Sequence, residues 1–349
     1  MPACQHCGRL HRNTPDSCPK TGLSMGAPGL VGTQLDRYQL EGLLGVGGFG
    51  SVYRARHVRT QARVALKVLK PELTADAVTL ARFLREASTA AAVGSEHIVR
   101  VLDAEVTAEG IAFIAMELLD GDDLKVIARR EGPLHPARVV NLCTQVLHGL
   151  GAAHEKGIVH RDMKPGNVFV SRRLDARGHE VEHAQVLDFG ISKVAGAKAL
   201  TMAGVTMGTP SYMAWEQFTD VRNVDARTDL YAVAVMLFEL LSGQKPFDGD
   251  DLAGLMNHVR IGERPELRSL RPSLPVPLCA VVEKGLQKHR ERRWQSAREF
   301  AAALQQSSIL LHDAPPLPPR PAPEEEEHET VDAEQAVKTL VRSEQKTQV

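Results

Sequence analysis

The 349-residue sequence has no long apolar run, almost no net charge and no recognisable leader. Its longest apolar stretches fall well short of the roughly 18 residues that a membrane-spanning helix needs, so no membrane span is predicted. The formal net charge is -1, which gives no reason to expect nucleic acid or an acidic membrane as a partner. The N-terminal stretch "MPACQHCGRL" lacks a basic region followed by an apolar one, so no signal peptide is predicted. We therefore expect a cytoplasmic protein.

Cysteine is scarce: the chain has five, and three of them fall in the first 18 residues. In a reducing compartment this clustering indicates metal binding rather than disulfides. A zinc ribbon would need a fourth ligand shortly after the third cysteine, where there is none, but His11 or His6 could complete a Cys3His site. The alternative is a disordered tail with free thiols. The candidate zinc ligands are Cys4, Cys7, Cys18 and His11.

The remaining composition, 43% hydrophobic and 24% charged, is that of an ordinary globular protein. Short apolar-polar stretches predict a small, mostly β unit with one helix at about 79–93, and helical periodicity follows it. A proline-rich stretch and an acidic run come last and predict disorder. The predicted order is a Cys/His-bearing segment (1–22), a linker (23–37), a β-rich part (38–119), a helical part (120–305) and a disordered tail (306–349).

One stretch of the helical part is apolar on nearly all sides. "DLYAVAVMLFELLSG" has no polar face, so it is predicted to be the central helix of its lobe, with Gly243 as its natural stop. A second stretch, "ARVVNLCTQVLHGLGAAHEKG", places its apolar residues on one broad face and predicts an amphipathic or buried helix.

Three glycines between two predicted strands are the first feature with chemical meaning. Gly45, Gly47 and Gly50 in "LGVGGFGSV" let a hairpin backbone approach a bulky anion, although glycines are also common in ordinary turns. Lys67 then stands inside an otherwise apolar strand, where burying an unpaired charge is costly. Glu86 in the following helix is a ready counter-ion, and the alternative is a Lys67 that faces solvent. We favour a lysine that reaches phosphate.

Two further stretches, "HRDMKPGN" and "LDFG", carry oxygen ligands and a carboxylate. Asn167 and Asp188 supply hard oxygen ligands that suit Mg²⁺ bound jointly with phosphates. Asp162 is left as a carboxylate that can orient and deprotonate a hydroxyl.

With these motifs in place the chain resembles the eukaryotic-type protein kinases, in particular their bacterial serine/threonine branch. Six motifs occur in the family's order, namely "GVGGFGSV", "VALKVL", "HRDMKPGN", "DFG", "GTPSYMAWE" and "DARTDLY". The resemblance covers roughly residues 38–305. It implies the α+β, bilobal protein kinase fold, with a small β-rich N-lobe (38–119) carrying one helix and a larger, mainly α C-lobe (120–305). It also implies ATP-dependent phosphoryl transfer to Ser/Thr hydroxyls of protein substrates.

The resemblance implies a role for each matching residue. Lys67 would contact the α- and β-phosphates and pair with Glu86, Asp162 would be the catalytic base, and Lys164 would steady the γ-phosphate. Asn167 and Asp188 would hold Mg²⁺. Met116 would be the gatekeeper and 117–119 the hinge, whose backbone bonds adenine. The implied nucleotide site comprises Leu44, Gly45, Val46, Gly47, Gly48, Phe49, Gly50, Ser51, Val52, Ala65, Lys67, Met116, Glu117, Leu119, Asp123 (on the ribose) and Phe169.

Substrate class and regulation follow from the same resemblance. Lys164 and Thr209 match the serine/threonine pattern, and Arg161 before the base is a feature that the family links to activation by phosphorylation. Thr201 and Thr206 are the candidate acceptors. A pseudokinase-like nucleotide-binding scaffold is the alternative, but the intact Lys67, Asp162, Asn167 and Asp188 argue against it. A small-molecule kinase is disfavoured by Thr209 and "GTPSYMA". The sequence does not indicate the physiological substrate, the upstream signal or the oligomeric state.

Three sites in the C-lobe depart from the family pattern. Trp215 replaces the usual proline in "AWE", Ala234 replaces a glycine of the central helix, and His289-Arg290 replaces an Asp-Pro pair. Glu216 and Arg293 are both retained, so the ion pair that anchors this segment is expected to form.

Overall fold

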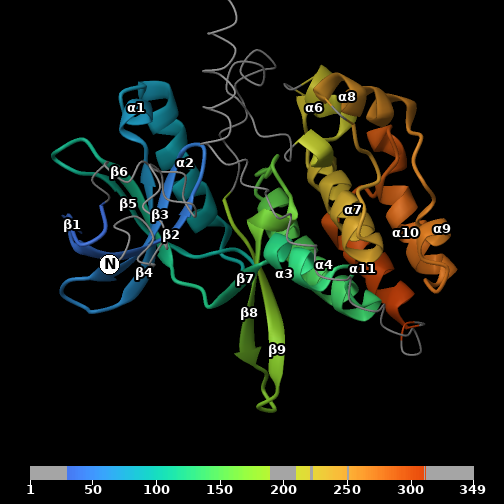
Figure 1. Cartoon of the computed structure of the whole chain (residues 1–349), viewed down its shortest axis with the longest axis horizontal. Helices are drawn as coiled ribbons and strands as arrows, with labels where there is room; N and C mark the ends of the chain where they lie inside the picture. The colour runs from blue at the N-terminus through green and yellow to red at the C-terminus, as the bar shows by residue number, and fades with distance from the viewer. Residues whose placement is uncertain (1–29, 189–209, 221–222, 250, 310, 312–349) are drawn as a thin grey trace, which may run out of the picture.

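The computed structural model describes residues 30–188, 210–220, 223–249, 251–309 and 311. These residues form two lobes, one built on a sheet and the other mainly of helices, as Figure 1 shows. None of the helices within the described ranges combines the length and apolar character that a membrane span requires. The α+β, two-lobed architecture that the sequence predicts is confirmed.

The N-lobe is an antiparallel six-stranded sheet in the order β1-β2-β3-β4-β6-β5, with the long helix α2 beside it. Asp76 caps α2 by accepting hydrogen bonds from the N–H groups of Val78 and Thr79, and Gly94, with φ of 67°, ends it in the left-handed region. The elements are β1 (Gln34–Leu35), β2 (Tyr38–Val46), β3 (Gly50–His57), β4 (Arg63–Leu69), α1 (Pro71–Thr74), α2 (Ala77–Val93), β5 (Val101–Val106) and β6 (Ala112–Glu117).

Two details of this lobe differ from the sequence-based expectation. Strand β1 lies within 23–37, the segment predicted to be a linker, because Leu35 is buried and pairs with Tyr38 of β2. A one-turn helix, α1, stands before α2 and begins at Pro71, where proline's fixed φ suits a first helical residue.

The C-lobe packs its helices around α7, the predicted central helix. Almost every side chain of α7 is buried, and Gly243, with φ of 77°, ends the helix as predicted. Ala234, one of the residues that depart from the family pattern, packs against Gly285 of α10. A side chain at position 285 would clash, because an added Cβ would lie 2.5 Å from the Ala234 Cβ. The helices are α3 (Leu124–Glu131), α4 (Pro136–His154), α6 (Trp215–Thr219), α7 (Arg227–Ser242), α8 (Leu252–Ile261), α9 (Leu267–Leu270), α10 (Val276–Gly285) and α11 (Ala297–Ser308).

A second sheet, which the sequence did not predict, is flanked by two of the candidate site residues, Asn167 before β8 and Asp188 after β9. It has the order β7-β8-β9, with β7 (Gly121–Asp123), β8 (Val168–Leu174) and β9 (Glu180–Val186). The β8–β9 hairpin projects away from both lobes in Figure 1. At its base Val168 pairs with Val186, and Leu187 N–H donates to the Asn167 carbonyl at 2.9 Å. The hairpin therefore brings Asn167 and Asp188, which are far apart in the sequence, to the same place.

Candidate active site

The glycine-rich turn joins β2 to β3 and leaves its backbone accessible. Gly45 pairs with Val52 and Val46 with Ser51, and Gly47 N–H donates to the Gly50 carbonyl at 2.8 Å. Gly50 has to be glycine, because a Cβ there would lie 2.1 Å from the Val68 carbonyl oxygen. The remaining members are exposed or partly exposed, so the turn presents its backbone outward; they are Leu44, Val46, Gly47, Gly48, Phe49 and Ser51.

Cross-strand pairing places several of the predicted nucleotide-site residues opposite one another, in each of the two sheets. Ala65 of β4 lies directly opposite Met116 of β6, and Asp123 of β7 lies opposite Phe169 of β8. Val52 of β3 faces Lys67 across the β3–β4 ladder. The predicted hinge begins at Glu117, the last residue of β6, and the half-buried Leu119 lies in the connection to β7. Asp123 also caps α3, because its Oδ1 accepts from Val126 N–H at 2.9 Å.

Lys67 is buried between two carboxylates. Its Nζ lies 2.9 Å from Glu86 Oε1 and 2.8 Å from Asp188 Oδ1, and its side chain is only 13% exposed, which rules out the solvent-facing alternative. Burial alone would lower the pKa of Lys67, but the charges of Asp188 and Glu86 outweigh that effect and raise it. Burial raises the pKa of Glu86. The ammonium is therefore held as a cation where a phosphate could meet it.

The catalytic loop is fixed by hydrogen bonds between its own residues. Lys164 Nζ lies 2.8 Å from Asp162 Oδ2, and Asn167 Nδ2 donates to the Asp162 carbonyl at 2.8 Å. Asp188, with φ of 45°, and Arg161, with φ of 67°, adopt left-handed backbone conformations that non-glycine residues rarely take. Such strained residues concentrate at functional sites, where the surrounding contacts maintain them.

Two residues that the sequence reasoning did not single out hold this loop from the C-lobe side. Asp229 of α7 is 1% exposed, and its two oxygens accept from the N–H groups of His160 and Arg161, each at 2.8 Å. Gln217 of α6 donates to the Arg161 carbonyl at 2.9 Å. Asp229 could have been singled out from the sequence, because it is a carboxylate at the start of a mainly apolar stretch and a buried carboxylate needs a polar partner.

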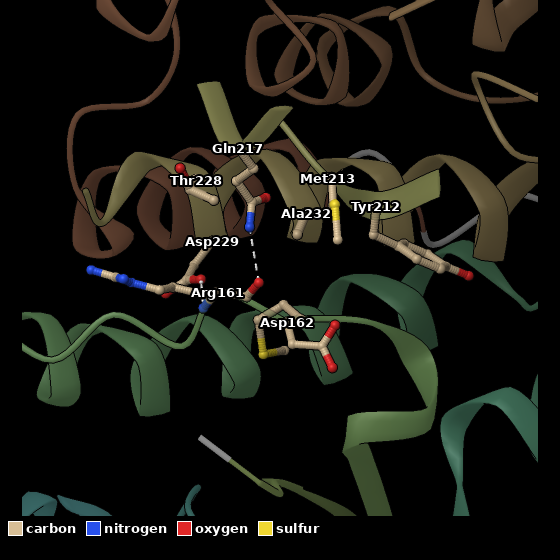
Figure 2. Close-up of a pocket in the computed structure, with 9 residues that line it drawn as sticks. Arg161, Asp162, Tyr212, Met213, Gln217, Thr228, Asp229 and Ala232 are labelled. Carbon is tan, nitrogen blue, oxygen red and sulfur yellow. Dashed lines mark hydrogen bonds between the residues drawn. The ribbon is translucent and has the colours of Figure 1, made fainter. Parts of the chain in front are cut away.

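A small pocket lies between the loop and the C-lobe helices. Figure 2 shows Tyr212, Gln217 and Asp229 around the loop residues Arg161 and Asp162, with the bond from Gln217 drawn as a dashed line. Met163, Met213, Thr228 and Ala232 complete its lining. The loop residues Arg161 and Asp162 are therefore bordered by the segment from Tyr212 to α6.

The Glu216–Arg293 ion pair is present and buried. Arg293 donates from Nη1 to Glu216 Oε1 at 2.6 Å and from Nη2 to Oε2 at 2.9 Å. Trp215 is the first residue of α6, packs partly buried against the C-lobe core, and has Lys288 Nζ 5.3 Å from its ring centroid. At the site of the missing Asp-Pro pair, His289 precedes the short helical turn Arg290–Arg292, and its side chain makes no capping hydrogen bond to that turn. The Arg290 side chain donates to the Asn223 carbonyl.

Several predicted residues lie outside the described residues. They are the candidate zinc ligands Cys4, Cys7, Cys18 and His11, the candidate phosphorylation sites Thr201 and Thr206, Thr209, and the tail beyond 311.

Comparison with known proteins agrees with this geometry. The sequence model of the family described as "Protein kinase domain" matches residues 38–306. Serine/threonine-protein kinase pkn3 of Myxococcus xanthus is 40% identical over 275 residues, which cover 77% of this chain and 49% of that protein. Serine/threonine-protein kinase PknH of Mycobacterium tuberculosis is 36% identical over 307 residues, covering 84% of this chain and 47% of that protein.

Among solved structures, the Mycobacterium tuberculosis PknI kinase domain superimposes with a TM-score of 0.61 at 30% identity. The match covers 80% of this chain and 99% of that one. The chain spans about half the length of the curated relatives it matches.

Proposed function

The chain belongs to the protein kinase family, and on that premise we propose that it is an ATP-dependent serine/threonine protein kinase. The observation that carries the proposal is the buried contact of Lys67 with both Glu86 and Asp188, beside a catalytic loop in which Asp162, Lys164 and Asn167 are mutually bonded. A pseudokinase-like nucleotide-binding scaffold, the alternative function, would not require all of these residues.

Each part of ATP has a candidate partner among these residues. The exposed backbone of the glycine turn can face phosphate, and the Lys67 ammonium can bind the α- and β-phosphates. Ala65, Met116 and Phe169 offer apolar surface for adenine, and the Glu117–Leu119 hinge offers backbone groups. Asp123 can accept from the ribose with the oxygen that does not cap α3.

The donor set also fits magnesium. Asn167 donates from Nδ2 to the Asp162 carbonyl, which leaves its Oδ1 as a possible metal ligand. The Asp188 carboxylate contacts the Lys67 ammonium and could likewise bind a metal cation. Two protein oxygens suffice, because Mg²⁺ usually completes its coordination with water and substrate phosphates. When bound, Mg²⁺ would neutralise charge on the β- and γ-phosphates.

The reaction then depends on alignment and charge. The Asp162 carboxylate would orient the Ser/Thr hydroxyl and take its proton as the hydroxyl oxygen bonds the γ-phosphorus and the bond to the β-phosphate oxygen breaks. Lys164, 2.8 Å from Asp162, would offset charge on the transferred group. Asp229 and Gln217 act as positioning residues, since they bond the backbone beside Asp162.

Regulation by autophosphorylation of Thr201 or Thr206 is part of the proposal. Within the described part of the chain, Arg161 forms no ion pair, so its guanidinium is available to an anion. A phosphothreonine is a strong bidentate partner for such a group. We also keep a cytoplasmic location, protein substrates and a zinc site at Cys4, Cys7, Cys18 and His11 as proposals.

Incubation of the full chain with labelled ATP, Mg²⁺ and a generic protein substrate tests the function. We expect label on Ser or Thr, and we expect Asp162→Asn to abolish transfer while ATP binding stays nearly intact, because this carboxylate meets the hydroxyl and not the nucleotide. ATP binding without any transfer by the wild-type protein would favour the scaffold. Wild-type turnover in Asp162→Asn would remove Asp162 from the role of base.

A further inference from the structure

The side chain of Gln185 joins β9, the strand that leads to Asp188, to the start of the hinge. Its Nε2 donates to Glu117 Oε1 at 2.8 Å, and its Oε1 accepts from Arg173 Nη2 at 3.1 Å. Only this orientation of the amide suits both partners, because an ionised carboxylate only accepts hydrogen bonds and a guanidinium only donates them. Gln185 is 2% exposed, so water competes little for these bonds.

Glu117, the first residue of the predicted hinge, is also held from the N-lobe. Its Oε1 accepts a second hydrogen bond from the N–H of Arg100 at 2.9 Å, and its own N–H donates to the Arg100 carbonyl at 3.0 Å. Arg100 belongs to the connection between α2 and β5, whereas Gln185 belongs to the second sheet. The Glu117 carboxylate is therefore a point at which the two sheets are fixed to each other.

Gln185 lies beside residues of the predicted nucleotide site without being one of them. In the β8–β9 ladder it is the direct partner of Phe169, which in turn lies opposite Asp123 of β7. Directly opposite residues of antiparallel strands share a face of their sheet, so the Gln185 and Phe169 side chains lie on one face. The hydrogen bonds of the Gln185 side chain go to Glu117 and Arg173 and not to the catalytic loop.

We propose that Gln185 is a positioning residue for the nucleotide: it holds Glu117 so that the hinge backbone is already arranged for adenine when ATP arrives. The proposal rests on the proposed kinase function and adds to it a residue outside the predicted nucleotide site. A hinge that must first be ordered binds ATP more weakly, in proportion to the fraction of molecules that have the competent arrangement. The effect therefore belongs to ATP affinity and not to the rate of transfer at saturating ATP.

The expected size follows from the loss of one hydrogen bond to the hinge. The net contribution of such a bond corresponds to about a threefold to tenfold change in an equilibrium constant, so Gln185→Leu should raise the Kd and KM for ATP by about that factor. Leucine has nearly the volume of glutamine and suits a buried position. Gln185→Glu should raise both constants further, because it places a second carboxylate against Glu117.

The experiment uses the full chain and measures four quantities for each variant. They are the Kd for ATP with Mg²⁺ by calorimetry, the KM for ATP, kcat with a protein substrate at saturating ATP, and Tm. We expect Gln185→Leu to change Kd and KM for ATP while kcat stays within about twofold of wild type.

Exchanging the two side chains provides a rescue. In Glu117→Gln/Gln185→Glu the amide at position 117 can donate to the carboxylate at position 185 and still accept from the Arg100 N–H. The carboxylate at position 185 can also pair with Arg173, which already contacts the native amide. We therefore expect the double variant to recover most of the ATP affinity that Gln185→Glu alone loses.

The matched control is Gln145→Leu on α4. Gln145 Nε2 donates to the Glu182 carbonyl at 3.1 Å, and its Oε1 accepts from the Ala184 N–H at 2.8 Å. This glutamine therefore makes two hydrogen bonds to β9 and none to the hinge. Gln145→Leu should lower Tm and leave the Kd for ATP as in wild type, which separates positioning of the hinge from general support of the strand.

The outcomes distinguish this inference from the function beneath it. An unchanged Kd for ATP in Gln185→Leu, or an equal rise in Gln145→Leu, would overturn the positioning role and leave the kinase function standing. So would a double variant that binds ATP no better than Gln185→Glu, and this comparison holds even where Gln185→Leu does not fold. A wild-type chain that transfers phosphate to no protein would overturn the function itself, whatever the Kd values show.

Discussion

Replacing Glu216 by alanine tests the anchor that holds α6 against the C-lobe. The change would leave the Arg293 guanidinium, whose side chain is 0% exposed, without its carboxylate partner. Arg293 would keep hydrogen bonds from Nε to the Gln287 carbonyl at 2.6 Å and from Nη2 to the Lys288 carbonyl at 2.7 Å. Those neutral acceptors do not balance its charge. Thr228 Oγ1 would also lose its acceptor, Glu216 Oε1, at 3.0 Å.

The expected cost is large. Removing one partner of a buried ion pair typically costs about 3–5 kcal/mol. For a domain of this size each kcal/mol shifts Tm by about 2–4 °C, so Glu216→Ala should melt about 6–20 °C below wild type. Activity should fall too, because Gln217 is the next residue and bonds the Arg161 carbonyl of the catalytic loop.

The neighbouring substitution Trp215→Pro should have a much smaller effect. Trp215 is the first residue of α6, where proline is favoured, and Ala214 before it is already extended, with φ of -72° and ψ of 155°. Proline gains about 0.4–1 kcal/mol by restricting the unfolded chain. It loses the partly buried indole and its contact with Lys288, so the net change should stay within about 2 kcal/mol.

These effects can be compared by measuring the melting temperature and the rate of peptide phosphorylation for both variants. The double variant Glu216→Ala/Arg293→Met should be less destabilised than the sum of the single variants, since it leaves no unpaired buried charge. A Glu216→Ala melting temperature within about 2 °C of wild type would refute the anchor. An inactive wild type that Trp215→Pro restores would show that the tryptophan disables the enzyme.

Three further predictions concern phosphorylation, zinc and pH. Mass spectrometry of the active protein should show phosphate on Thr201 or Thr206, and an unmodified segment in fully active protein would exclude this form of regulation. Metal analysis of the full chain should give about one zinc, lost in Cys4→Ser/Cys7→Ser, whereas zinc absent from wild type would leave the free-thiol alternative. Burial alone would raise the pKa of Glu216, but Arg293 outweighs it and lowers the pKa. The stability advantage of wild type over Glu216→Gln should therefore be complete above about pH 4.3 and shrink as the pH falls through the folded pKa, and an advantage that does not change on acidification would contradict this.

The sequence predicted the parts of the fold in which a local pattern matches its environment. Helix α7 was recognisable because burial on all sides requires apolar residues on all sides, and Gly243 marked its end. The Lys67–Glu86 pair was predictable because an isolated lysine in a buried strand needs a counter-ion. The β8–β9 hairpin was not predicted, because apolar residues do not mark the buried positions of its strands. The apolar Leu174 and Val181 are 70% and 42% exposed, whereas the polar Ser171, His183 and Gln185 are buried.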